Sequence, residues 1–230
     1  MLILAFETSA KAAGTALMED GVLLGESYQN AGITHSRTLL SMAQSLLECC
    51  GKTPADVTAV AAAAGPGSFT GIRVGVAAAK GFAFGRNIPC CGVSTLEAMA
   101  LSLGEWQGTV CPVMDARRNQ IYNAVFQMDC GKCIRIREDR AISIQEFRED
   151  LQNFPDPIFL VGDGSLLCYN QLLDSRLILP PEHRRQQRAS GVALAAGRML
   201  EQGLACDGAA LVPNYLRLSQ AERERLERTK

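Results

Sequence analysis

Apolar and polar positions follow two different periodicities along the chain. Short apolar runs predict buried strands, and apolar residues that recur every three or four positions predict helices. Glu19-Asp20-Gly21 lies between two strand-like segments, which is typical of a β-hairpin. In the first part of the chain these patterns predict, in order, a strand at 1–6, hairpin strands at 14–18 and 22–28, a helix at 34–50, a strand at 57–64, a helix at 72–84, a strand at 88–93 and a helix at 94–103.

A second set of elements follows a boundary segment at 104–108. The patterns predict strands at 110–114, 121–126, 133–138 and 158–161, and helices at 144–151, 166–173 and 189–202. We therefore expect a mixed α/β fold in two lobes, with residues 1–103 in the first lobe and 104–218 in the second. Residues 219–230 are a charged tail, which is either a solvated helix or disordered.

Composition limits the functional classes to which this chain can belong. It has 230 residues, of which 47% are hydrophobic, so one large domain or two small ones can bury a core. The net charge of −1 argues against a strongly electrostatic binder of nucleic acid or membrane. We find no secretory signal and no apolar stretch near the ~20 residues that a membrane span needs, and we expect a cytoplasmic protein without a membrane partner.

Nine cysteines occur, an odd number that includes two pairs of sequence neighbours, so we expect reduced thiols. Cys130 and Cys133 have the spacing of a redox pair or of half a zinc site. Zinc needs four ligands, but there is no second pair with this spacing, and the two histidines lie far apart. We interpret the segment as a hairpin turn and expect no metal site.

The most distinctive motif is the segment 65–73, GPGSFTGIR, where a predicted strand meets the start of a helix. The start of a helix is a natural anion site, so the segment could bind phosphate. It is not a Walker A loop, because no lysine follows Gly71, and Thr70 stands where a GxGxxG motif has its third glycine. A tight structural turn is the alternative, and the sequence leaves both readings open.

Other polar segments also follow predicted strands. The segment 7–9, Glu-Thr-Ser, could hold a metal-bound nucleotide phosphate or could be a turn with satisfied side chains. The segment 162–165, Gly-Asp-Gly-Ser, has two glycines that let a ligand approach the backbone closely. Asp115, with two arginines beside it, belongs either to a polar site in the cleft or to salt-bridged loop charges. The basic run 183–188 either touches nucleic-acid phosphate or is solvated.

These motifs occur in an order that resembles the TsaB family, also called YeaZ. The segments that carry the resemblance are 7–9, the hairpin, 65–75, 114–118 (MDARR), 162–164 and 213–217 (PNYLR), and they span nearly the whole chain. The resemblance implies an actin/Hsp70/sugar-kinase-like (ASKHA) fold, in which each of two lobes has a mixed sheet flanked by helices. It also implies a bacterial complex with a TsaD-type transferase and a TsaE-type ATPase, which forms N6-threonylcarbamoyladenosine at position 37 of tRNAs reading codons that start with A.

Catalytic TsaD-type relatives carry an H-x-x-x-H pair at positions that correspond here to Thr95 and Met99, and neither side chain can replace imidazole as a metal ligand. Glu97 lies on the same turn, where we expect it to cap the helix with Ser94. We therefore expect no catalytic residue and a non-catalytic scaffold that binds the transferase and reaches tRNA through the complex. The alternatives are an active nucleotide-dependent kinase, ATPase or transferase of the same fold group, or a peptidase, for which the chain has no zinc motif and no credible triad.

The resemblance also suggests binding residues. The candidates for a nucleotide site are Ser9, Gly67, Gly162 and Gly164. We expect no required cofactor, although ATP or ADP with Mg²⁺ could bind at the partner interface. Two predicted helices, 34–50 and 70–84, are expected to lie side by side and to contact the transferase, or a second copy of the chain in a homodimer. The candidates for that interface are Met42, Leu46, Gly75 and Ala79.

Overall fold

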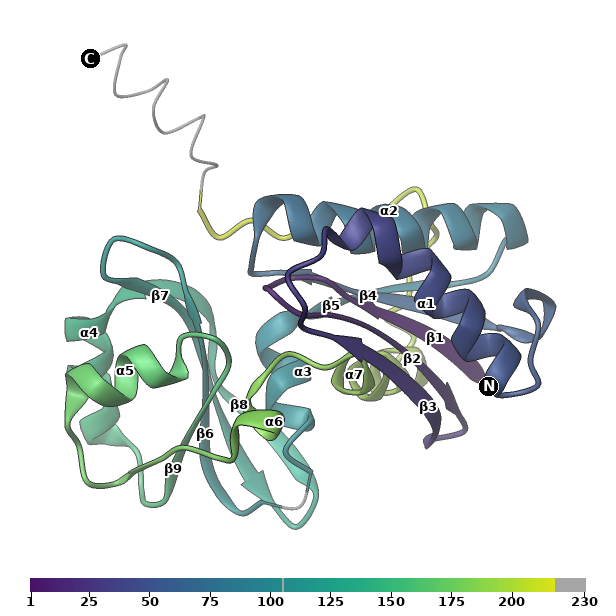
Figure 1. Ribbon diagram of the computed structural model, residues 1–230. Helices are drawn as coiled ribbons and strands as arrows, with labels where there is room; N and C mark the ends of the chain where they lie inside the picture. The colour runs from purple at the N-terminus through teal and green to yellow at the C-terminus, as the bar shows by residue number, and fades with distance from the viewer. Residues whose placement is uncertain (105, 218–230) are drawn as a thin grey trace.

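The computed structural model describes residues 1–104 and 106–217, so the predicted tail at 219–230 lies outside the described residues. The chain forms two lobes, and each contains a five-stranded mixed sheet flanked by helices (Figure 1). This arrangement confirms the predicted α/β architecture. Among the described residues, no helix is long and apolar enough to cross a membrane.

The sheet of the first lobe has the strand order β3-β2-β1-β4-β5. Its strands are β1 (Leu2–Glu7), β2 (Ala13–Glu19), β3 (Val22–Gln29), β4 (Ala59–Gly65) and β5 (Cys90–Ser94). The strands β1, β2 and β3 form an antiparallel meander, whereas β1, β4 and β5 run parallel. The hairpin predicted at Asp20-Gly21 is confirmed, with positive φ angles of 49° and 81° at these two residues.

Both faces of this sheet are covered by helices (Figure 1). The helices α1 (His35–Cys49) and α2 (Phe69–Arg86) cover one face, and α3 (Thr95–Leu101) and α7 (Ala189–Glu201) cover the other. Side chains of a strand alternate between faces. Accordingly, Leu4 and Phe6 belong to the core under α1 and α2, whereas Ile3 and Ala5 belong to the core with α7.

The sheet of the second lobe has the order β10-β9-β6-β7-β8. Its strands are β6 (Gly108–Asp115), β7 (Gln120–Asp129), β8 (Lys132–Ser143), β9 (Ile158–Val161) and β10 (Leu177–Ile178). The helices α4 (Ile144–Asp150) and α5 (Ser165–Leu172) pack on one face. The sequence pattern did not reveal β10, the short α6 (Glu182–Arg185) or the two 3-10 turns at Pro54–Asp56 and Leu151–Asn153.

Helix α3 lies between the two lobes and contributes to both cores. Ala98 and Leu101 pack in the core of the first sheet, whereas Leu96 and Ala100 pack with the strands of the second. Around α3, the contact between the lobes is therefore an apolar core. An interface of this kind holds the two lobes in a defined relative position.

The predicted second lobe at 104–218 is wrong for its last part, because the chain returns to the first lobe after α6. Ala193 and Ala196 of α7 are fully buried in the core of the first sheet. Further on, Cys206 exchanges two backbone hydrogen bonds with Cys90 of β5. The apolar pattern of 189–202 predicts a helix but does not indicate which sheet it packs on. In the structure, this helix buries the face of the first sheet that lies opposite α1 and α2.

The interpretation of Cys130-x-x-Cys133 as a hairpin turn is confirmed. Cys130 and Gly131 have positive φ angles of 45° and 78° in the turn between β7 and β8. All nine cysteines are free thiols. Helix α2 begins at Phe69, before the predicted start, because the Ser68 hydroxyl accepts a hydrogen bond from the Gly71 amide at 3.2 Å.

Candidate functional site

The carboxyl ends of β1, β4 and β9 meet at a cleft between the lobes with a volume of about 600 Å³. Parallel strands that end at one edge of a sheet bring their following loops together, which is where ligands bind in open α/β sheets. Ser9, Lys11 and Gly67 line the cleft from the first lobe, and Asp115 and Asp163 line it from the second. Two predicted residues, Ser9 and Gly67, are thus brought together here.

The other two predicted nucleotide contacts, Gly162 and Gly164, do not line this cleft. Both are buried, and a Cβ atom on Gly162 would lie 2.2 Å from the carbonyl oxygen of Val113. These glycines therefore let the loop after β9 pack against β6. Asp163, between them, is the residue that the loop presents to the cleft.

The glycines of the segment 65–75 have a structural role. A Cβ atom would lie 2.4 Å from the Ser9 carbonyl oxygen at Gly67 and 2.1 Å from the Thr8 carbonyl oxygen at Gly71. The Ser68 amide also donates a hydrogen bond to the Ser9 carbonyl at 2.6 Å. The start of α2 therefore lies directly against the end of β1, as the structural alternative for this motif requires.

The floor of the cleft contains buried polar groups that lack partners. The Ser9 amide donates to Glu7 Oε1 at 2.6 Å, but Glu7 Oε2 and the Ser9 hydroxyl have no hydrogen-bond partner. Glu7 and Ser9 are 1% and 0% exposed. Burial raises the pKa of Glu7 from 4.5 to about 7, the neighbouring Ser9 opposes the rise, and the charge of Asp163 adds to it. A buried polar atom without a partner is costly unless a ligand or water satisfies it.

Asp163 faces this floor from the second lobe. Its carboxylate is still reached by solvent, yet the surrounding protein raises its pKa, mainly by desolvation. The amide of the buried Gln187 donates to Asp163 Oδ1 at 2.8 Å. This positioning role could not be predicted from the sequence, because Gln187 lies within the basic run 183–188, where charge is the only signal.

The functional groups of the cleft are of the types that bind a nucleotide phosphate and its Mg²⁺. The unpartnered Ser9 hydroxyl and the Lys11 ammonium group suit phosphate oxygens, and the carboxylates of Asp115 and Asp163 suit Mg²⁺ or its bound water. Among the described residues there is no group of three or more His, Cys, Asp or Glu residues that could hold a metal ion. A magnesium ion here would take most of its ligands from the nucleotide and from water.

Helix α3 carries Thr95 and Met99, the positions that the resemblance matches to a histidine pair. Thr95 is 0% exposed, and Met99 is 2% exposed and packs in the core between the lobes. The expected cap by Ser94 is confirmed, since its hydroxyl accepts a hydrogen bond from the Glu97 amide at 3.2 Å. The expected capping role of the Glu97 side chain is wrong, because this carboxylate pairs with Arg135 instead.

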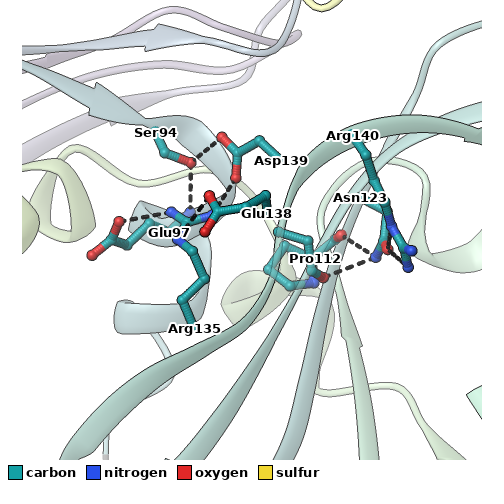
Figure 2. A network of polar contacts seen from close by, with 9 residues as sticks. Ser94, Glu97, Pro112, Asn123, Arg135, Glu138, Asp139 and Arg140 are labelled. Carbon is teal, nitrogen blue, oxygen red and sulfur yellow. Dashed lines mark hydrogen bonds and ion pairs between the residues drawn. The ribbon is translucent and has the colours of Figure 1, made fainter. Parts of the chain in front are cut away.

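This ion pair is part of a polar network that joins the lobes (Figure 2). Arg135 of β8 donates to Glu97 at 2.8 Å and to Asp139 at 2.5 Å, and the Ser94 hydroxyl donates to Asp139 at 2.5 Å. The network lines a second cavity of about 550 Å³ between the lobes. No local sequence pattern indicates this network, because its members come from β5, α3 and β8.

The predicted partner-contact residues face inward with one exception. Leu46, Gly75 and Ala79 are buried beneath the outer surface of α1 and α2, so these three predictions are corrected, whereas Met42 is half-buried. A Cβ atom on Gly75 would lie 2.5 Å from the Thr8 hydroxyl, so this glycine allows close packing inside the chain. Helical periodicity defines an apolar stripe, and on these helices that stripe faces the sheet.

Comparisons with known proteins agree with this architecture. The family model of TsaD, tRNA N6-adenosine threonylcarbamoyltransferase, matches residues 29–224. The "tRNA threonylcarbamoyladenosine biosynthesis protein TsaB" of Bacillus subtilis is 32% identical, with 100% of both chains covered. A solved structure from Pseudomonas aeruginosa, described as similar to the peptidase YeaZ, is 25% identical with a TM-score of 0.79, covering 94% of this chain and 99% of that one.

The likeness extends in fold alone to a sugar kinase. The ROK hexokinase from Thermus thermophilus is 11% identical with a TM-score of 0.50, and the match covers 88% of this chain and 100% of the hexokinase. The two lobes thus have the ASKHA fold that the motifs implied. The 32% identity to a TsaB relative over the full length of both chains, together with the match to the TsaD family model, shows that the chain belongs to the TsaB family, also called YeaZ.

Proposed function

We propose that this chain is a non-catalytic scaffold in the formation of N6-threonylcarbamoyladenosine on tRNA, and that it works by binding a TsaD-type transferase. The names of the TsaB relatives support the pathway, and the match to the TsaD model supports a partner of the same fold. A TsaE-type ATPase would join the complex, and a homodimer would use the same surface when the transferase is absent.

The observation that carries this proposal is a set of exposed apolar and small residues on the outer surface of α1 and α2. These helices lie side by side on the outer face of the first lobe (Figure 1). Leu40 is 63% exposed and Phe84 is 87% exposed, and both project from this surface. On α2, Ala77 and Gly81 are exposed and small, so helices of a partner can approach closely. We call the exposed positions 40, 77, 81 and 84 the outer stripe.

The environment of α3 supports a role without catalysis. Thr95 and Met99 match the histidine pair by the resemblance, both are buried, and Met99 packs in the core between the lobes. The Met99 sulfur would lie 3.0 Å from a Cβ atom on Gly162, so the neighbouring loop packs closely against it. An apolar, close-packed environment of this kind favours structural use of the helix.

The test of the scaffold role is binding to the TsaD-type transferase of the same organism, followed by titration calorimetry. Leu40→Asp and Phe84→Asp should each weaken binding by about 30-fold or more, because an exposed charge replaces a buried apolar contact. Leu173→Asp is the matched control, since Leu173 is 85% exposed on the second lobe. Wild-type affinity of both outer-stripe variants, or threonylcarbamoyl transfer by this chain alone, would refute the proposal.

A nucleotide in the cleft is a second candidate function, favoured by the unpartnered hydroxyl of Ser9. ADP or ATP with Mg²⁺ would place a phosphate oxygen against Ser9 and Lys11, either in the free chain or at the partner interface. Calorimetry with Mg–ADP should give a binding isotherm that Ser9→Ala weakens and the exposed control Ser41→Ala does not. Heat equal to buffer dilution, for both the chain and its complex, would remove this candidate.

A further inference from the structure

The segment 213–217, which we call the strap, crosses the cleft between the lobes. In the first lobe, the Asn214 amide donates to the Ala64 carbonyl at 2.6 Å. In the second lobe, Arg217 donates to the Ala116 carbonyl in the turn between β6 and β7. Asn214 and Leu216 line both interlobe cavities, the one with Ser9 and the one with Arg135. The strap therefore separates the two cavities and connects the lobes.

Besides these two hydrogen bonds, the strap is held at the protein surface through Tyr215. The Tyr215 ring stacks on Phe69 with 4.4 Å between centroids, and Arg73 Nε donates to the Tyr215 hydroxyl at 2.8 Å. The Arg73 guanidinium also lies 3.9 Å from the centroid of Phe69. Tyr215 is 39% exposed, and Val212, just before the strap, is 65% exposed. Segments held by few exposed contacts open at low free-energy cost.

Arg73 links this strap to the surface that we assign to the partner. The exposed positions of α2 are spaced as one helical stripe, at Thr70, Arg73, Ala77, Gly81 and Phe84. A partner on the outer stripe therefore lies beside Arg73. The five N–H donors of a guanidinium group can be taken over by acceptors of the partner, which would remove the hold on Tyr215.

We propose that the strap is a gate between the two interlobe cavities, and that docking of the transferase on α2 releases it through Arg73. This inference rests on the proposed scaffold function. In the free chain the strap is closed and the cavities are separate. In the complex the strap leaves Ala64, and the two cavities join into one cleft that is open to ligand and partner.

Hydrogen exchange measured by mass spectrometry tests the gate in the full-length chain. Arg73→Ala should speed exchange of the peptide that contains Asn214 by about 3- to 10-fold, because a hydrogen bond and a cation–π contact are lost. Arg86→Ala is the matched control, since Arg86 lies on the same helix but donates to the carbonyls of Pro54 and Ala55. An exchange rate in Arg73→Ala equal to that of wild type would overturn the proposed hold.

The second arm compares the free chain with its complex with the transferase. The expected result is slower exchange in α1 and α2 together with faster exchange in the strap. Slower exchange in α1 and α2 with an unchanged or slower strap would overturn the gate and leave the scaffold intact. No slowing in α1 and α2 would refute the scaffold function, and the gate would fall with it.

Discussion

Replacing Glu7 by glutamine is expected to stabilise the protein at and above neutral pH. Glu7 is 1% exposed, and burial raises its pKa from 4.5 to about 7. Between these two pH values the unfolded chain releases a proton that the folded chain retains, so stability falls as the pH rises. A tenfold change in proton affinity is worth about 1.4 kcal/mol, and the full cost of ionising Glu7 above pH 7 is about 3 kcal/mol.

Glutamine lacks this cost because it stays neutral, and its Oε1 can still accept the hydrogen bond from Ser9. Urea unfolding at several pH values measures the difference between the variant and the wild type. That difference should grow in favour of Glu7→Gln by about 2 to 3 kcal/mol from pH 5 to pH 8, which moves the urea midpoint by about 1 M. Glu201→Gln, at the exposed end of α7, should show no such growth. A constant difference between Glu7→Gln and wild type over this range would mean that the carboxyl group is already ionised in the folded protein.

Two more stability predictions follow from the packing. Gly71→Ala should lower the free energy of unfolding by about 2 to 4 kcal/mol, because its Cβ would lie 2.1 Å from the Thr8 carbonyl oxygen. Gly81→Ala, whose Cβ would have no atom within 4 Å, should be neutral or raise the free energy of unfolding by up to about 1 kcal/mol. Urea midpoints that fall equally for both would contradict this reasoning. Arg135→Met should cost about 1 to 3 kcal/mol, since Glu97 and Asp139 lose their cation. In urea unfolding, the double variant Arg135→Met/Glu97→Gln should lose less stability than the sum of the losses in the two single variants.

Most elements could be predicted from local sequence patterns, whereas the polar contacts of the site could not. The hairpin at Asp20-Gly21 depends on residues that tolerate positive φ angles, and this preference is visible in the sequence. Ser9 and Gly67 were placed correctly at the cleft because both follow the carboxyl ends of predicted strands. The pair of Glu97 with Arg135 joins residues that are 38 positions apart, and no local pattern connects them.

The sequence by itself determined the order of most strands and helices, the hairpin at Asp20-Gly21 and the family, because turn chemistry and periodicity act over a few neighbouring residues. The tertiary structure alone decided which surface each helix buries. Leu46 and Ala79 are buried against the first sheet, and α7 packs on the opposite face of the same sheet. The reason is that an apolar helix stripe packs on the uncovered sheet face that lies beside it. It also decided that Met99 would lie in the core between the lobes, since that environment exists only after both sheets have assembled around α3.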